Sequence, residues 1–289
     1  MYEYYTERNY RGDYPYTDLA CERRRADTDI DGVDYKREIG IGGNWERMKI
    51  TTRAGAESIG RPMGIYDTLQ LGRMDLLDAE GLDDAADELA RELCYIADAS
   101  DIFPERLLVV GLGNDALTPD AIGCESARRV RATLHIKDCD PSFFKTLDCS
   151  EIVVCTPGIA SRSGVDAAIT VKGLCEMIAP DAVIAIDALA SRSPKRLGST
   201  VQISNTGISP GSGLGNPRHS LDIDTLGFPV ISIGVPTVID TRLLCQSGND
   251  IISPGAPAMF VAPREISEIV QSASQIIGDG INRAFGIYQ

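Results

Sequence analysis

Two acidic residues stand where hydrolytic chemistry is feasible. Asp120 closes a glycine-rich stretch that follows the apolar run Leu107–Val110, and Asp187 directly follows the apolar run Val183–Ile186. If these runs are neighbouring strands, two carboxylates at their exits can share a water molecule, one as general base and the other as general acid. Peptide hydrolysis without a covalent intermediate needs at least such a pair of carboxylates. Carboxylates at such a place can also bind a metal ion, and the sequence leaves that alternative open.

Each aspartate also has a structural interpretation. Thr118 and Pro119 suit the N-cap and first position of a helix, so Asp120 would lie in its first turn. There the helix dipole favours a carboxylate by about 0.3–1 kcal/mol. Asp187 can likewise cap a short turn after its strand. Position alone therefore does not decide between a structural and a catalytic role.

Two glycine-rich loops are candidates for substrate binding. One follows the apolar run that ends at Val110, and the other covers residues 205–216. Successive backbone amides in such loops can face a substrate's carbonyl groups or an oxyanion, although a plain irregular loop is the alternative. The predicted substrate-binding residues are Gly111, Gly113, Asn114, Gly207, Gly211, Ser212 and Gly213.

Other catalytic motifs fit less well. Gly111-x-Gly113-x-x-Ala116 imitates a dinucleotide-binding fingerprint, but Pro119 moves the helix start several residues beyond the glycines. Asn205-Thr206-Gly207 has an amide where pepsin-like proteases have an acid, and it has no second copy. The Gly-x-Ser-x-Gly motif of serine hydrolases is absent. Cys155 is better explained as a buried thiol at a strand end than as a nucleophile.

Composition narrows the class of protein further. The 289 residues carry a formal net charge of −14, so the surface repels phosphate backbones and we predict no direct nucleic-acid binding. No stretch approaches the roughly 18 apolar residues of a membrane span, and the first sixteen residues do not form a signal peptide. We expect a cytoplasmic protein. The eight cysteines form no C-x-x-C pair, and we predict no cofactor and no metal.

The pattern of apolar runs predicts an α/β fold. Short runs that are apolar on both faces favour a mostly parallel or mixed sheet flanked by helices. Two further strands, on either side of the glycine-rich residues 54–64, predict a small β-rich appendage. The expected strands are Trp45–Thr52, Tyr66–Leu71, Leu107–Val110, Ile152–Cys155, Val183–Ile186 and Val230–Ile233. The expected helices are Asp83–Ala99, Pro119–Leu134, Gly164–Ile178 and Arg264–Phe285.

The chain resembles the spore germination protease family along nearly its whole length. Single motifs are weak, but their order and number are specific. The matching stretches are Thr17–Glu22, Gly55–Gly60, Val110–Asn114, Thr118–Gly123, Pro157–Ile159, Ala185–Ser193, Gln202–Ser204, Gly207–Ile208, Pro210–Gly213 and Ile233–Val238.

This resemblance implies a function, a fold and a site. Members of the family initiate degradation of the small acid-soluble proteins that coat spore DNA, and their fold is similar to that of hydrogenase maturation proteases. The catalytic candidates are the aspartates of the Thr-Pro-Asp and Ile-Asp-Ala-Leu-Ala motifs, here Asp120 and Asp187. We therefore expect an endopeptidase of the forespore or spore core whose substrates are small acid-soluble spore proteins.

The resemblance also implies a homotetrameric zymogen that removes its own N-terminal segment. By the match, the processing site lies between Asp18 and Leu19, with Glu22 downstream completing the similarity to a substrate. Residues 1–18 would then be a propeptide-like extension, and residues 19–289 a single α/β peptidase domain.

The chain departs from the family pattern in one loop. Asn205 and Ser209 stand where many relatives carry Asp and His, so neither an acid nor an imidazole there can be essential to a shared mechanism. Two alternatives stay open. One is a metal-dependent maturation protease on the same fold, acting on a folded metalloprotein. The other is a binding protein that has kept the fold but lost turnover.

Overall fold

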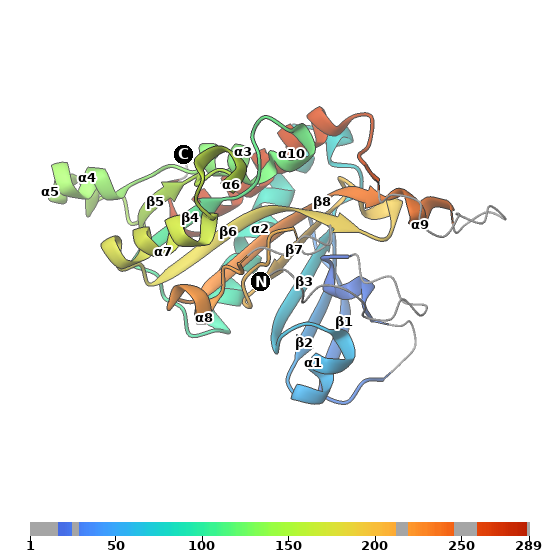
Figure 1. Ribbon diagram of the computed structural model, residues 1–289. Helices are drawn as coiled ribbons and strands as arrows, with labels where there is room; N and C mark the ends of the chain where they lie inside the picture. The colour runs from blue at the N-terminus through green and yellow to red at the C-terminus, as the bar shows by residue number, and fades with distance from the viewer. Residues whose placement is uncertain (1–16, 25–28, 212–218, 246–258, 288–289) are drawn as a thin grey trace.

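A computed structural model describes residues 17–24, 29–211, 219–245 and 259–287 (Figure 1). The strands of this part form one nine-stranded sheet in the order β1-β2-β3-β7-β8-β6-β4-β5, with β9 paired to β8. The strands are β1 (Val33–Ile39), β2 (Asn44–Ile50), β3 (Gly64–Gln70), β4 (Arg106–Gly111), β5 (Glu151–Cys155), β6 (Ala182–Ser191), β7 (Thr200–Ser204), β8 (Val230–Asp240) and β9 (Phe260–Val261).

Helices and short 3-10 turns connect these strands. The longer helices are α1 (Arg53–Ile59), α2 (Ala79–Asp98), α3 (Ile122–Arg129), α7 (Ala167–Ile178) and α10 (Ile266–Phe285). The shorter helices are α4 (Leu134–Cys139), α5 (Pro141–Phe144), α6 (Ala160–Ser163), α8 (Ile223–Leu226) and α9 (Thr241–Cys245). The 3-10 turns are η1 (Ala20–Glu22), η2 (Met74–Leu76), η3 (Thr118–Asp120) and η4 (Pro194–Arg196).

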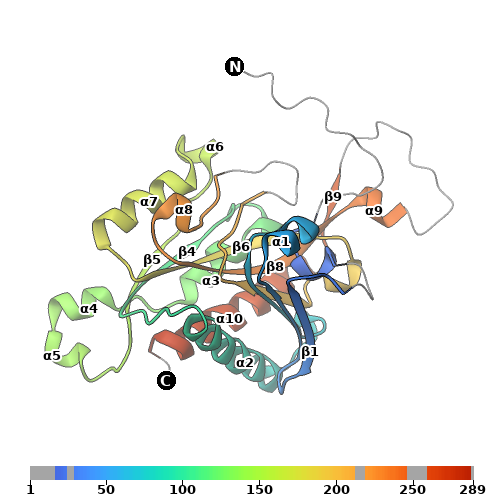
Figure 2. The same ribbon diagram turned by 90° about the horizontal axis from the view of Figure 1, so that it is seen from below.

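The half of the sheet formed by β5, β4, β6 and β8 is parallel and buried on both faces. In β4, Leu107 and Val109 pack into the core with α2 and α10, whereas Leu108 and Val110 pack into the core with α7. Figure 2 shows α2 and α10 side by side on one face, and α7 with α8 on the other. The two-sided burial explains the continuous apolar runs, and the predicted α/β fold with a mixed sheet is confirmed.

The other half of the sheet is antiparallel and encloses a smaller core. Strands β1, β2, β3 and β7 pair antiparallel in turn, and β7 pairs antiparallel with β8. The segment expected as a glycine-rich connection contains helix α1, which begins because the Thr52 hydroxyl accepts a hydrogen bond from the Gly55 amide and ends at Gly60, where φ is 69°. The core beneath α1 contains Ala20, Val33, Met48, Ile50, Ile59 and Tyr66.

The predicted helix Pro119–Leu134 is confirmed only over Ile122–Arg129. The structure has the 3-10 turn η3, then α3, and the chain leaves the helical conformation at Val130. Asn282 of α10 causes this end, because its side chain donates to the Arg129 carbonyl at 3.0 Å and accepts from the Arg131 amide at 2.9 Å. A contact with a distant helix therefore replaces two hydrogen bonds that a longer helix would make. Among the described helices, none is both long and apolar enough to cross a membrane.

Candidate active site

Asp187 lies within a strand, not at its end as predicted. Strand β6 continues to Ser191 because β8 runs beside it, and Asp187 is paired with Gly234. On its other side β4 stops at Gly111, opposite Ile186, so Asp187 is the first residue of β6 beyond β4. Its carboxylate accepts a hydrogen bond from the Ala188 amide at 2.9 Å, and the residue is 5% exposed. The alternative, a cap for a short turn after the strand, is also wrong, since β6 continues to Ser191.

Asp120 is the last residue of η3, not part of an α-helix's first turn. Thr118 makes no side-chain cap, contrary to the prediction. The Asp120 carboxylate instead accepts a hydrogen bond from the Asn114 amide at 2.9 Å. Gly113 makes this closure possible, because it has φ 98° and a Cβ atom there would lie 2.1 Å from the Asp120 carbonyl oxygen. The glycine loop after β4 thus positions Asp120.

One cavity brings the two aspartates together. It has a volume of about 300 Å³, and Asp120 and Asp187 line it together with Asp18. Residues far apart in the sequence surround them: Gly113, Leu117, Pro119, Ala188, Leu189, Ala190, Pro210, Gly211, Thr237, Val238 and Phe260. The structure thus brings to one cavity the two carboxylates that the sequence singled out. Among the residues that the structure describes, no group of three His, Cys, Asp or Glu side chains is arranged to hold a metal ion.

The predicted glycine-loop residues are distributed over different places. Gly111 is buried at the end of β4, where a Cβ atom would lie 2.3 Å from the Gly123 carbonyl oxygen, so it packs against α3 and is not among the cavity residues. Gly211 lines the aspartate cavity, and Gly207 lines a smaller neighbouring pocket of about 130 Å³. Ser212 and Gly213 lie outside the described residues.

Residues 17–22 are seated beside this cavity. The Asp18 amide donates to the Ala190 carbonyl at 2.9 Å, and the Ala190 amide donates to the Asp18 carboxylate at 2.9 Å. The segment thereby binds β6 three residues beyond Asp187. The side chains of Leu19 and Ala20 are completely buried, so the attachment is a packed interface and not a loose surface contact.

Two side chains hold the peptide groups around Asp18 and Leu19. Arg61 donates from Nη2 to the Asp18 carbonyl at 2.7 Å and to the Thr17 carbonyl at 3.1 Å. Gln202 donates from Nε2 to the same Asp18 carbonyl at 3.3 Å and accepts from the Ala20 amide at 2.7 Å. Sequence reasoning missed both residues. The one available signal was a glutamine in the alternating stretch Thr200–Ser204, since a buried glutamine needs partners.

A cluster of donors receives the carboxylate of Glu22. The Ser191 hydroxyl donates to it at 2.6 Å, the Arg192 amide at 2.7 Å and the Ser193 amide at 3.2 Å. Arg196 adds a positive charge, with its Nε 3.6 Å from the carboxylate. Hydrogen bonds to an ionised acceptor are the stronger kind, so Glu22 anchors the segment at the end of β6.

The sheet register places the groups that contact this segment on one face. Gln202 pairs with Gly234, and Gly234 pairs with Asp187, so Gln202 and Asp187 project from the same face on either side of a glycine. Neighbouring strands are about 4.8 Å apart, which separates the two backbones by roughly 10 Å. Thr68 and Glu46 continue the same row across β3 and β2.

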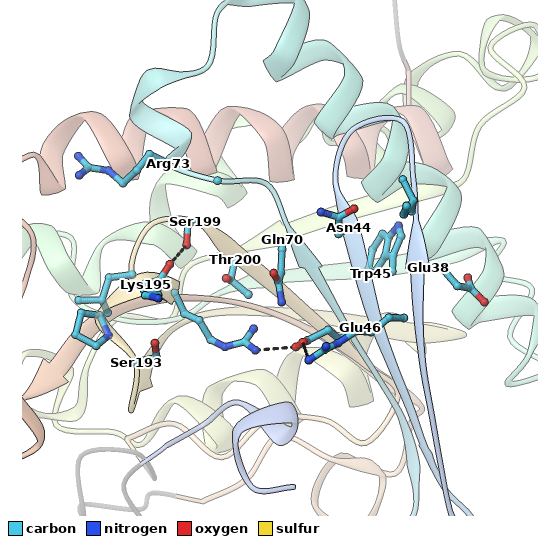
Figure 3. A pocket seen from close by; sticks show the side chains of 16 residues that line it. Glu38, Asn44, Trp45, Glu46, Gln70, Arg73, Ser193, Lys195, Ser199 and Thr200 are labelled. Carbon is cyan, nitrogen blue, oxygen red and sulfur yellow. Dashed lines mark hydrogen bonds and ion pairs between the residues drawn. The ribbon is translucent and has the colours of Figure 1, made fainter. Parts of the chain in front are cut away.

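A larger cavity lies next to the donors that bind the Glu22 carboxylate, and neither Asp120 nor Asp187 lines it. It has a volume of about 950 Å³ and lies between the β1–β3 strands and residues 193–200 (Figure 3). Arg196 joins its two sides, because its Nη2 lies 2.7 Å from the Glu46 carboxylate. Size alone would favour this cavity, but its two carboxylates, Glu38 and Glu46, are both paired with arginines, so the aspartate cavity is the better candidate for chemistry.

The cysteines near the site are poor nucleophiles. Burial raises the pKa of the Cys21 thiol to about 12 and that of the Cys124 thiol to about 11. Burial also raises the pKa of Cys155 above its ordinary value. Because the thiolate is the reactive form, these side chains are unreactive at neutral pH.

Comparison with known proteins identifies the family. The pattern of the germination protease family of peptidases matches residues 16–253. Germination proteases of Clostridium perfringens and Caldanaerobacter subterraneus are 34% and 33% identical, covering 93% of this chain and 94% and 93% of theirs. The Bacillus subtilis germination protease is 36% identical over 82% of this chain and 66% of its own length. The chain therefore belongs to the germination protease family.

A similar solved structure is that of the [NiFe] hydrogenase maturation protease HycI from Thermococcus kodakarensis. It is 19% identical and covers 62% of this chain and 94% of its own, with a TM-score of 0.30. A likeness of this degree supports no inference about activity.

Proposed function

We propose that this protein is an aspartate-dependent endopeptidase made as a zymogen, which cuts itself between Asp18 and Leu19. The observation that carries the proposal is that Asp18 lines the same cavity as Asp120 and Asp187. The bond expected to be cut is thus held beside the carboxylates expected to cut it.

In the proposed reaction, one aspartate takes a proton from a water molecule, which attacks the carbonyl carbon of Asp18. The other aspartate gives a proton to the nitrogen of Leu19, and the carbon–nitrogen bond breaks. The products are a carboxylate at Asp18 and an amine at Leu19. The cavity can hold the water molecule, since about 300 Å³ is many times the volume of one.

The full-length protein would be inactive towards other proteins because its own residues 17–22 occupy the place of a substrate. While residues 17–22 fill the site, an external chain cannot reach the hydrogen bonds that Ala190, Gln202 and Ser191 already make. Removal of the first 18 residues frees the contacts that Ala190, Arg61 and Gln202 make with Asp18. A substrate then displaces residues 19–22 from their remaining contacts with Gln202 and Ser191. Residues 19–289 then form the peptidase domain.

The sequence of the segment that fills the site predicts the sequence pattern of the substrate. We propose that substrates carry an acid before an apolar pair and a glutamate four residues after that acid, as in Thr17–Glu22. Membership of the germination protease family supports small acid-soluble spore proteins as these substrates. It equally supports a homotetramer in the cytoplasm of the forespore or spore core.

The test incubates full-length protein and protein beginning at Leu19 with a small acid-soluble spore protein, and maps the products by mass spectrometry. We expect defined cuts, made faster by the shorter protein and unaffected by a chelator, and none with Asp120→Asn or Asp187→Asn. Normal cutting by either variant would refute the catalytic assignment. Loss of cutting on chelation would instead favour a metal-dependent maturation protease.

A further inference from the structure

We propose that Arg61 and Gln202 bind the carbonyl oxygen of the bond that is cut and stabilise the negative charge that develops on it. This inference rests on the proposed function, because it takes Asp18–Leu19 as that bond. The aspartates would move protons, and these two residues would supply the electrostatic part of catalysis.

Arg61 provides a fixed positive charge at this oxygen. Its Nη2 lies 2.7 Å from the Asp18 carbonyl oxygen, which is a short hydrogen bond to the oxygen on which negative charge would develop. The same nitrogen lies 3.1 Å from the Thr17 carbonyl oxygen and 3.8 Å from the Asp18 carboxylate. The side chain is 18% exposed, so water screens its charge only partly.

Gln202 provides a second donor whose orientation is determined by the segment itself. The Ala20 amide can only donate, so the side-chain oxygen of Gln202 must face it, at 2.7 Å. The side-chain NH₂ group then faces the Asp18 carbonyl, at 3.3 Å. Gln202 is 8% exposed and spans the bond, with one contact on each side of it. A correctly seated segment therefore aims the donor at the carbonyl oxygen.

The two donors and the two aspartates approach Asp18 from different pockets. Arg61 and Gln202 line the small pocket, Asp120 and Asp187 line the aspartate cavity, and Asp18 lines both. In this arrangement the carbonyl oxygen is held from the antiparallel half of the sheet. In the proposal, water activated by the aspartates of the parallel half attacks the carbonyl carbon.

The charge in the proposed step is balanced as follows. Attack of water, with loss of its proton to the basic aspartate, converts the carbonyl into a tetrahedral centre with a negative oxygen. The guanidinium of Arg61 and the amide of Gln202 stabilise that oxygen. When the carbonyl re-forms, the amine of Leu19 leaves with a proton from the acidic aspartate. Removal of one such donor typically lowers kcat about 100- to 1,000-fold.

The experiment uses protein beginning at Leu19 and a peptide with the sequence of residues 10–26. Arg61→Met removes the charge, and Gln202→Glu keeps the acceptor for the Ala20 amide while replacing the donor. Arg53→Met is the matched control, because Arg53 is 91% exposed on α1 and pairs with Glu57. We expect kcat to fall about 100-fold or more for the two site variants with KM changed only a few-fold, and no change for the control.

A second probe separates stabilisation of the oxyanion from binding of the peptide. In this probe, the Asp–Leu carbonyl of the peptide is reduced to a methylene, so the contacted oxygen is absent. We expect wild type and both variants to bind it within a few-fold of one another. Unchanged kcat, or a loss confined to KM with equally weakened binding of this probe, would overturn the proposal.

The experiment also distinguishes this inference from the proposed function. If wild type fails to cut the peptide at Asp–Leu, the proposed function fails and takes the inference with it. If wild type cuts but Arg61→Met and Gln202→Glu cut equally fast, only the inference fails. Thermal unfolding checks that each variant folds. Should Arg61→Met not fold, Arg61→Lys keeps the charge but loses the forked donors, and we expect a smaller drop in kcat.

Discussion

The two halves of the sheet differ in what they bury. The parallel half buries aliphatic side chains on both faces and carries Asp187 at the point where β4 stops. The antiparallel half buries ionisable groups: Asp67 of β3 and Glu92 of α2 are 2% and 3% exposed, and both lie within 3 Å of Arg47. In the proposed function, the parallel half supplies the proton-transfer groups, and its strand β6 holds Asp18 and Glu22. The antiparallel half supplies Arg61 and Gln202, which hold the carbonyl group of Asp18.

Replacement of an aspartate by asparagine is expected to have the largest effect. Asp120→Asn and Asp187→Asn should each lower the rate of peptide cleavage about 100- to 10,000-fold, the usual contribution of a general acid or base. Asp115→Asn is the matched control, since Asp115 lies in the same loop as Asp120 but is exposed and paired with Arg128 and Arg162. An equal loss in the control would mean that the loop, and not the carboxylate, is what matters.

The next effect concerns the loop that positions Asp120. Gly113→Ala should destabilise the protein by more than Gly158→Ala, because both glycines have positive φ but only a Cβ at Gly113 meets an obstacle, 2.1 Å away. The conformation alone costs about 1–2 kcal/mol, which is the value expected for Gly158→Ala. Thermal unfolding measures both, and cleavage should suffer only in Gly113→Ala. Similar stability of the two variants would contradict the close contact with Asp120.

A smaller effect tests how the end of β6 recognises the segment. Glu22→Gln keeps the shape of the side chain but removes the charge that Ser191, Arg192 and Ser193 solvate. Hydrogen bonds to charged groups contribute about 1.5–3 kcal/mol, so self-cleavage should slow by at least about tenfold. Glu57→Gln, an exposed change on α1, serves as the control. Unchanged processing of Glu22→Gln would show that this carboxylate does not seat the segment.

The smallest expected effect is a change in the pH dependence of stability, and it arises from Asp67 in the antiparallel half. Burial, and then the neighbouring Glu92, raise the pKa of Asp67 from 3.8 to about 8, against the opposing charge of Arg47. The folded protein therefore holds a proton that the unfolded chain has lost, so this group makes stability fall as pH rises from about 4 to 8. Asp67→Asn should flatten that decline in thermal unfolding, whereas Asp34→Asn, at an exposed position of β1, should not. An equally steep decline in Asp67→Asn would contradict the shifted pKa.

The parallel half could be predicted from sequence because strands that are buried on both faces consist of continuous apolar runs. Strands β4, β5, β6 and β8 and helices α2, α7 and α10 were all expected, with ends shifted by several residues. Strand β1 was missed because six of its seven residues are not buried, and β7 because the polar residues Thr200, Gln202 and Ser204 leave it without a continuous apolar run. The end of β6 was misplaced because its apolar run stops at an aspartate that faces a cavity, although the ladder with β8 continues.

The site was predictable only where one residue carries the signal. Asp120 and Asp187 stand out after apolar runs, and the structure brings both to one cavity. Arg61 has no local signal, and the signal of Gln202 is only a polar residue within an alternating stretch, because the roles of both depend on contacts with residues 17–20 across more than 40 positions of sequence. Such partners follow from tertiary packing alone.

The most direct test of the central claim is to let purified full-length protein process itself and to determine the new N-terminus by mass spectrometry. The account predicts a single new terminus at Leu19 in wild-type protein, formed at a rate independent of protein concentration, and no such product from Asp187→Asn. A stable product that begins at another residue, or the Leu19 terminus appearing in Asp187→Asn at the wild-type rate, would contradict it.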